Sequence, residues 1–478
     1  MSATAEQGAI GAAAPLPVLR VLQIWSGHLV VFAIPMTAAA FVWSGPHPWY
    51  TAPLFIVPLA IFHWLDTRPR FERRQPLESI PAWPFDQLVY LLAGLHLVML
   101  AGLVRLFSHQ AFFSLDMLMV VLVVGAASGF SIITAHELIH RRQPAARLLG
   151  RLMLGSVLYE HFYTEHLRGH HVRVGTREDP ATAHYGETYR EFWRRTVPGQ
   201  FRSAWALEVT RLRDANASFS LLTALENRVL QGLVIGWGIA LGILALFGWP
   251  AFIAYLLQAF LAVRLLEAVN YFEHWGLERS GRRIRAADSW DTYSWFTYYG
   301  LVGLSRHADH HMAPARPYQQ LRVRDEAPVL PLGYVALVDM VVANNAEFIR
   351  LAKNELRARQ LGPFSSEAGR EAAQREDDRV TRESGMATFL GDLSPVIRRT
   401  VLPGLLLLGV SVGAWVEANS AQPFLGILLR NLVIAGVFAG LLVGRERLDQ
   451  RVQNGWISWG CAFLLLWVIG TGLEGLIG

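Results

Sequence analysis

Cysteine is almost absent from this sequence, which contains one, Cys461, and charged residues make up only 17% of it. A single thiol excludes a disulfide framework, a CxxC zinc site and a cysteine-held iron–sulfur site. Any bound metal must therefore be held by histidine or carboxylate. The scarcity of charge excludes an ordinary soluble domain, in which roughly a quarter of the residues are charged. The sequence also lacks a flavin-binding glycine motif and a haem attachment motif, so redox chemistry would need electrons from another protein.

Long apolar runs are abundant, since 53% of the 478 residues are hydrophobic and the mean hydropathy is +0.29. Several runs approach or exceed the roughly 20 residues needed to cross a bilayer. The predicted fold class is all-α: a polytopic membrane protein with a six-helix bundle, a cytoplasmic histidine-rich metal-binding region and about three additional C-terminal spanning helices. The predicted spans are about 21–43, 50–65, 87–107, 113–134, 229–247, 250–269, 399–416, 424–444 and 455–475.

Arginine is distributed unevenly between the loops, which predicts an orientation. The loops at 66–86, 141–227 and 279–397 are rich in Arg, whereas those at 44–49, 108–112 and 248–250 contain neither Lys nor Arg. Cytoplasmic loops collect basic residues, so we expect the N-terminus to lie in the cytoplasm of a bacterial-type cell, with the protein in the inner membrane. The net charge of +5 fits basic loops beside anionic lipid better than nucleic-acid binding.

These boundaries predict four parts. Residues 1–18 form an N-terminal tail, 19–345 a membrane-embedded catalytic domain, 346–397 a charged cytoplasmic linker, and 398–478 a three-helix membrane extension.

Nine of the 16 histidines fall in four runs: HELIH (136–140), EHLRGHH (165–171), EHWGL (273–277) and RHADHH (306–311). A spacing of four residues places two side chains on one helical face, so His136 and His140 can point at one metal. His166 and His170 repeat that spacing. By the parity of the spans all four runs lie at the same membrane face, which predicts one metal centre. The predicted ligands are His136, His140, His166, His170, His171, His274, His307, His310 and His311.

The number of histidines indicates which metal chemistry to expect. Imidazole suits zinc, copper, iron and nickel, and HELIH resembles the HExxH of zinc peptidases. A zinc peptidase, however, needs only about three protein ligands and an open position. Nine imidazoles imply two metals and favour paired iron with dioxygen. Nearby acids can accept the second N–H of a ligand histidine, or can be solvated acids on a basic loop; they are Glu137, Glu165, Asp179, Glu273 and Asp309.

Four stretches together resemble a known family: HELIH, EHLRGHHVRVGTREDPATA, NYFEHWGLER and RHADHHMAPARPYQQLR. In this order and spacing they are similar to the integral-membrane alkane hydroxylases, the alkane 1-monooxygenases of the fatty-acid desaturase and hydroxylase superfamily. The resemblance covers about residues 20–345. Two features depart from the family: Trp275 stands where Tyr is usual, and the C-terminal extension adds three apolar runs.

The resemblance implies a non-haem di-iron site held by the nine histidines, with six spanning helices around an apolar channel. It also implies the insertion of one atom of dioxygen into a terminal C–H bond of a medium- or long-chain alkane. Electrons would come from rubredoxin, reduced by an NAD(P)H-dependent rubredoxin reductase. Arginines near the motifs could dock such an acidic carrier, although they also follow the positive-inside rule; they are Arg141, Arg142, Arg168, Arg173, Arg177, Arg306, Arg316 and Arg322.

An alkane offers no polar group, so the shape of the channel must set selectivity. Trp43, Phe55, Phe62 and Trp64 are candidates for lining it, and lipid-facing aromatics are the alternative. The same chemistry on an alkylaromatic, terpenoid or fatty acyl chain remains open, as does desaturation. A metal transporter or sensor predicts ionisable residues at mid-membrane depth. The predicted ligands instead lie at the ends of spans whose interiors are nearly free of acids.

Overall fold

The computed structural model describes residues 18–48, 51–67, 71–76, 80–108, 115–215, 224–279 and 281–383. Over these residues the chain is helical and forms no β-strand beyond two isolated bridges, so the all-α prediction is confirmed. The predicted N-terminal tail, apart from residue 18, and the three C-terminal spans lie outside the described residues.

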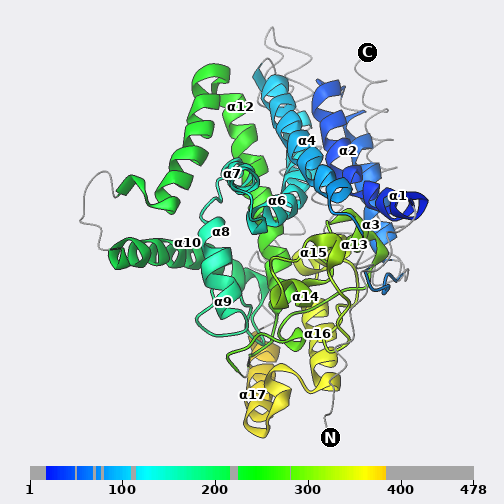
Figure 1. Cartoon of the computed structure of the whole chain (residues 1–478), viewed down its shortest axis with the longest axis vertical. Coiled ribbons are helices and arrows are strands. Elements are labelled where there is room, and N and C mark those ends of the chain that lie inside the picture. The colour runs from blue at the N-terminus through cyan, green and yellow to red at the C-terminus, as the bar shows by residue number, and fades with distance from the viewer. Residues whose placement is uncertain are drawn as a thin grey trace, which may run out of the picture.

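Four helical segments of the described chain are long and apolar enough to cross a membrane: Val18–Ser44, Trp83–Ser108, Leu122–His140 and Arg228–His274. The last of these, α12 (Arg228–His274), contains two predicted spans. Gly248, which has φ 80° and ψ 176°, and Pro250 interrupt its helical geometry. The two arms of α12 therefore meet in a bend, seen at the top of Figure 1.

The ends of two helices differ from the prediction. The fourth predicted span ended at residue 134, but α6 (Gly125–His140) continues through HELIH, after the short α5 (Leu115–Met119) and the π-helical turn η3 (Val120–Val124). Helix α12 likewise continues to His274. The prediction ended each span at its first polar residues. In the structure these polar helix ends are buried by protein packing, so the helical hydrogen bonding continues through them. The second run forms only the shorter helix α3 (Ile56–Thr67), preceded by η2 (Ala52–Phe55).

The first membrane segment consists of α1 (Val18–Gly27), η1 (His28–Phe32) and α2 (Ala33–Ser44), and α4 (Trp83–Ser108) follows α3. Helix α7 (Pro144–Gly155) lies beside the long helices in Figure 1, and the elements that follow it, apart from α12, lie at and below their lower ends. These lower elements are α8 (Phe162–Glu165), η4 (His166–His170), α9 (His171–Arg173), α10 (Tyr189–Asp214), η5 (Ala286–Asp288), α13 (Trp295–Gly300), α14 (His307–Met312), η6 (Tyr318–Gln320), α15 (Tyr334–Ala343), α16 (Asn345–Arg359), η7 (Gly362–Ser365) and α17 (Glu367–Glu383).

Close packing of α6 against α12 brings two histidine runs together. A Cβ atom on Gly129 would lie 2.8 Å from the Cβ of Leu265, and one on Gly125 would lie 2.8 Å from the Cβ of Leu261. Glycine at these two positions therefore permits a helix separation that a larger residue would prevent. The ends of α6 and α12 carry HELIH and His274 respectively, so this contact sets the distance between them.

The main hydrophobic core continues from α4, α6 and α12 into the helices that follow α14. Phe348, Leu356 and Phe364, which fall in the predicted linker, are buried in it. The start of α15 is held by Asp66 of α3, whose carboxylate accepts hydrogen bonds from Val335 N at 2.7 Å and from Thr297 Oγ1 at 2.8 Å. These contacts join the membrane-side helices to the region that contains the histidines.

Candidate metal centre

The structure gathers the nine histidines of the four sequence runs into two groups, each with its ligand nitrogens within 4.8 Å of one another. The first group consists of His136, His140, His166, His171 and His310. The second group consists of His170, His274, His307 and His311, and all four of its side chains are buried. Helices α6 and α12 supply three of the nine, and the segments η4, α9 and α14 supply the rest.

A π-helical turn decides how the run EHLRGHH is divided. Residues His166–His170 form η4, a turn with one more residue than an α-helical turn. His166 and His171 therefore share the first group, with their Nε2 atoms 3.0 Å apart, while His170 joins the second group. The α-helical spacing predicted that His166 and His170 would point the same way, and that prediction was wrong because the backbone is locally π-helical.

Helix α14 lies between the two groups. His310 belongs to the first group, whereas His307 and His311, four residues apart, belong to the second. HELIH behaves as its spacing predicts, because His136 and His140 both belong to the first group. The i, i+4 pairs on α6 and α14 thus converge within a group.

The distances between imidazoles match those of ligands around an ion. In the first group the Nε2–Nε2 distances are 3.0 Å for His140–His166 and 3.2 Å for His171–His310. In the second group, His307 Nε2 lies 3.0 Å from the Nε2 atoms of both His274 and His311. Imidazole binds zinc at about 2.1 Å, and two such ligands at a right angle are roughly 3.0 Å apart.

The protonation of the imidazoles also fits metal binding. Burial, reinforced by neighbouring imidazoles, holds the pKa well below its usual value in five histidines outside the long apolar segments: His166, His171, His307, His310 and His311. A neutral imidazole carries one N–H and one lone pair, and the lone pair is the metal ligand. Among the described residues, the buried Nε2 atoms of His136 and His170 have no hydrogen-bond partner. The residues present therefore fit one ion in each group.

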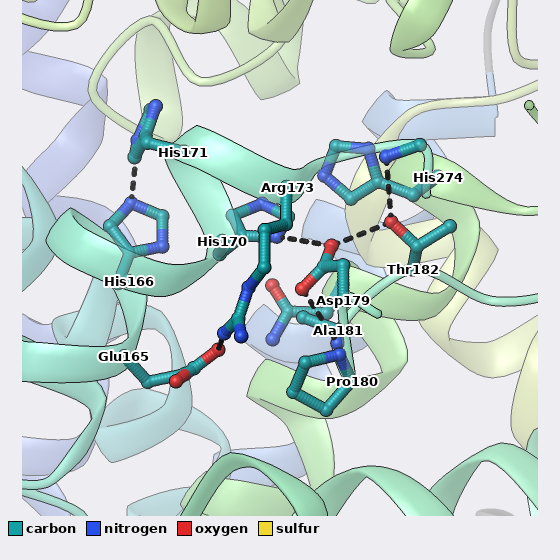
Figure 2. Close-up of polar contacts among 12 residues, drawn as sticks. Glu165, His166, His170, His171, Arg173, Asp179, Pro180, Ala181, Thr182 and His274 are labelled. Carbon is teal, nitrogen blue, oxygen red and sulfur yellow. Dashed lines mark hydrogen bonds and ion pairs between the residues drawn. The ribbon is translucent and has the colours of Figure 1, made fainter. Parts of the chain in front are cut away.

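Asp179 orients one ligand of the second group. Its Oδ2 lies 2.8 Å from His170 Nδ1 and accepts from Thr182 Oγ1 at 2.6 Å, while its Oδ1 accepts from Ala181 N at 3.1 Å (Figure 2). Burial alone would raise the pKa of Asp179, but the His170 imidazole and these hydrogen bonds outweigh it and hold the pKa below its usual value. The carboxylate fixes the ring so that Nε2 faces the second group.

The other four acids suggested by the sequence have two kinds of partner, an imidazole or an arginine. Glu273 Oε1 lies 3.3 Å from His307 Nδ1, beside the second group. The remaining three face arginines: Glu137 lies 2.7 Å from Arg141, Glu165 lies 2.7 Å from Arg173 (Figure 2), and Asp309 contacts Arg316 and Arg324 and accepts from Arg322 N at 2.9 Å. Burial would raise the pKa of Asp309, but these arginines and the Arg322 N–H hold it below its usual value.

One acid near the centre was missed by the sequence reasoning. Asp291 is buried and accepts a hydrogen bond from Ala308 N at 2.8 Å, at the start of α14. Burial raises the pKa of Asp291 to about 8. The residue stands 15 positions before the RHADHH run in an aromatic stretch, SWDTYSWF, and nothing in its local sequence pairs it with that run. The contact is tertiary and has no local signal.

A narrow apolar pocket, with a cavity volume of about 20 Å³, opens onto both groups. Its walls come mainly from α6 and α12, and it reaches His136 and His166 of the first group and His307 of the second. The lining residues are Gly129, Phe130, Ile132, Ile133, His136, Phe162, His166, Leu265, Leu266, Val269, Asn270, Glu273, Leu304 and His307. Apart from the histidines, Asn270 and Glu273 are its polar side chains.

The four aromatic residues suggested for a channel lie outside this lining. Trp43 is 44% exposed and donates to Val98 O at 3.0 Å, and Trp64 is 37% exposed. Phe55 packs against Phe41, and Phe62 stacks on a ring of α13. Five of the arginines suggested for docking have internal partners: Arg141 contacts Asp86 and Glu137, Arg168 contacts Glu208, Arg173 contacts Glu165, Arg306 donates to backbone carbonyls, and Arg316 contacts Asp309.

Comparison with known proteins identifies one matching family model and several similar proteins. The family model described as fatty acid desaturase matches residues 115–336. The alkane 1-monooxygenase of Acinetobacter baylyi is 39% identical over 230 residues, which are 47% of this chain and 56% of that protein. Alkane 1-monooxygenase 1 of Alcanivorax borkumensis is 34% identical over 282 residues, covering 56% of this chain and 69% of that protein.

A weaker match is to the xylene/toluene monooxygenase hydroxylase component XylM of Pseudomonas putida, at 25% identity over 206 residues, or 43% of this chain and 55% of that protein. The matched region thus spans little more than half of the Acinetobacter relative but more than two thirds of the Alcanivorax one. Residues 115–336, which the family model matches, contain the helices and turns that carry both histidine groups. The chain belongs to the alkane 1-monooxygenase family.

Proposed function

We propose that this chain is a membrane non-haem di-iron monooxygenase that inserts one oxygen atom from dioxygen into a terminal C–H bond of a medium- or long-chain alkane. The product is a 1-alkanol. One observation carries this proposal: two adjoining groups of histidines open into a single apolar pocket. The relatives named as alkane 1-monooxygenases, 34% and 39% identical, support the same reaction.

Each group is proposed to hold one iron ion, the first through five histidines and the second through four. Bound iron supplies the activation of dioxygen that no amino-acid side chain provides. Imidazole ligands alone fit several metals, so the choice of iron rests on the family. Asp179 and Glu273 orient His170 and His307, and the arginines beside Glu137, Glu165 and Asp309 stabilise the segments that carry the ligands.

The pocket residues bind and orient the substrate. An alkane is bound by the removal of its apolar surface from water, at about 25 cal/mol per Å². Phe130, Ile133, Leu265 and Val269 provide such a surface, and the histidines lie at one part of the wall. A chain that enters along this surface presents a terminal methyl group to them. The same walls exclude water from the reacting atoms.

The reaction consumes R–H, O2, two electrons and two protons and yields R–OH and H2O. We assign the electrons to rubredoxin, reduced by an NAD(P)H-dependent rubredoxin reductase. The absence of a flavin-binding motif from the sequence supports an external donor. We further assign the protein to the bacterial inner membrane, with the N-terminus and both histidine groups on the cytoplasmic side, because the arginine-rich loops lie at that end of the predicted spans.

A second candidate substrate is an alkylaromatic hydrocarbon. The match to a xylene/toluene hydroxylase component favours it, and the phenyl rings of Phe130 and Phe162 in the pocket wall suit a flat substrate. Because the chain is only 25% identical to this hydroxylase component, the alkane remains the preferred substrate. Desaturation by the same centre is a weaker variant.

The test is product analysis under ¹⁸O-labelled dioxygen. The purified full-length chain, loaded with iron in nanodiscs, is given rubredoxin, its reductase, NADH and a panel of alkanes and methylbenzenes, with His307→Ala as the inactive control. The proposal expects one labelled oxygen atom in a primary alkanol. Labelled benzylic alcohol without alkanol would support the second candidate. Oxygen-independent product, or no oxygen consumption, would contradict both.

A further inference from the structure

A carboxyl group that no part of the metal centre explains lies inside α12. Glu267 is fully buried, seven residues or about two helical turns before His274. It accepts hydrogen bonds from Tyr159 Oη at 2.9 Å, Gln200 Nε2 at 2.9 Å, Thr196 Oγ1 at 3.3 Å and Asn270 Nδ2 at 3.2 Å. All four of these donors are neutral. An ionisable residue inside an apolar spanning helix is costly and marks a function more often than a structural role.

One of these partners connects Glu267 with the pocket. Asn270 donates to Glu267 and also lines the pocket beside His136, His166 and His307. An alkane can neither donate nor accept a hydrogen bond, so an amide in this wall contributes nothing to substrate binding and disfavours it by its polarity. The amide must therefore serve the other reactants, which are dioxygen and protons.

The other partners lead away from the pocket. Tyr159 precedes α8, and Thr196 and Gln200 lie on α10, whose far face is exposed. Burial, together with the neighbouring Glu267, raises the pKa of Tyr159 well above its usual value, so the phenol keeps its proton and can both accept and donate one. The titratable groups around the network are Tyr159, Tyr189, Glu165 and His161, whose ring lies 4.3 Å from that of Tyr159.

We propose that Glu267 is a proton relay that supplies the protons consumed when dioxygen is reduced in the pocket. This inference rests on the proposed monooxygenase function. The Glu267 carboxyl gives a proton, through one water molecule held by the Asn270 amide, to the oxygen atom that leaves as water. It is reprotonated by way of the Tyr159 hydroxyl. Two such transfers balance the two electrons assigned to rubredoxin, so that R–H, O2, two electrons and two protons give R–OH and H2O.

The test compares the wild-type chain with Glu267→Gln, which keeps the size of the side chain and one accepting oxygen and removes its acid. We expect kcat to fall by about 10-fold or more. The KM for the alkane and the iron content should stay unchanged. The solvent isotope effect on kcat should increase, and hydrogen peroxide should be released in place of alkanol. Glu267→Asp should recover part of the rate.

Two further variants separate a relay from a structural support. Asn270→Leu removes the pocket contact but leaves Glu267, and should repeat the loss of kcat. Gln258→Leu is the matched control, because Gln258 is buried on the same helix, donates to Ser156 O at 3.1 Å and lies outside the pocket. Infrared difference spectra, with and without iron, should contain a titrating carboxyl C=O band that Glu267→Gln lacks.

Wild-type kcat and solvent isotope effect in Glu267→Gln would overturn the relay. Loss of iron from both Glu267→Gln and Asn270→Leu would also overturn it, because the network would then be a structural support. A wild-type chain that consumes no oxygen contradicts the proposed function instead, and the infrared band still tests the titration of Glu267.

Discussion

The two histidine groups differ in how their ligands are held. Within the described residues, the second group has carboxylates behind two of its four members, Asp179 at His170 and Glu273 at His307. In the part of the chain that the structure describes, no ion pair or hydrogen bond joins a carboxylate to the five histidines of the first group, and His140 in that group is only half-buried. The second group is thus positioned by a hydrogen bond at His170 Nδ1 and by a carboxylate near His307 Nδ1, whereas the first is positioned by helix geometry and by one additional ligand. Two sites with the same ligand chemistry can be stabilised by different parts of the fold.

The largest effects are expected from removing the central ligand of each group. His166 contacts the Nε2 atoms of His140 and His171, and His307 contacts those of His274 and His311. We expect His166→Ala and His307→Ala each to lose one of two irons and more than about 100-fold of alkanol formation, since outer contacts alone are worth 10- to 100-fold. Metal analysis and product yield measure this. His161→Ala, a buried histidine outside both groups, should keep both irons.

A change in α14 should affect both groups together. Asp309 holds the loop after α14 through Arg316 and Arg324, and α14 carries members of both groups. Asp309→Asn leaves these arginines without their charge partner and should lower the free energy of unfolding by about 3 kcal/mol. The unfolding midpoint in detergent and the iron content check it. A selective loss from one group would contradict this role. Glu347→Gln, which affects an exposed ion pair with Arg350, is the control.

A substitution of the carboxylate that contacts the second group should lower the iron affinity of that group alone. Asp179→Asn keeps the shape of the side chain but removes the charge beside His170 Nδ1. We expect iron affinity to fall by about 10- to 100-fold in the second group and to stay constant in the first. Stepwise chelation of the loaded protein measures the two affinities. Glu347→Gln, which affects an exposed ion pair with Arg350, should leave both unchanged, and equal losses in both groups on Asp179→Asn would contradict the comparison.

The smallest effect is expected from a substitution that alters the pocket and leaves both histidine groups intact. Phe130 lines this pocket and also a smaller neighbouring one of about 10 Å³ bounded by Ile34, Leu92 and Val302. Phe130→Ala should join the two and raise kcat/KM for longer alkanes relative to shorter ones by about 10-fold, the value of roughly one methylene. A competition assay with mixed alkanes measures the ratio. Leu103→Ala, buried outside both pockets, should keep the wild-type preference.

Local spacing predicted those features that depend on regular helices. The all-α fold, the apolar spans and the convergence of His136 with His140 follow from periodicity along a single helix. His166 and His170 were predicted to point the same way and do not, because no residue pattern announced the π-helical turn η4. The hinge predicted at Gly248 and Pro250 between two spans corresponds to the bend between the two arms of α12, where the backbone at Gly248 is not helical.

The contacts between residues far apart in the chain could not be predicted from the sequence. Five acids near the motifs were equivalent by sequence, but two face imidazoles and three face arginines, since the arginines arrive from distant segments or adjacent turns. The sequence suggested Trp43, Phe55, Phe62 and Trp64 for a substrate channel, whereas other residues line the apolar pocket, six of them Leu, Ile or Val. Glu267 did carry a signal, an acid inside an apolar run, that the sequence reasoning passed over.

The central claim is that the two groups hold one iron each, in distinct surroundings. Mössbauer spectroscopy of the full-length chain loaded with ⁵⁷Fe, combined with metal analysis, tests it most directly. The proposed function predicts two irons per chain and two quadrupole doublets of equal area, of which Asp179→Asn perturbs one. One iron per chain, a single symmetric pair of sites, or zinc in place of iron would contradict the account.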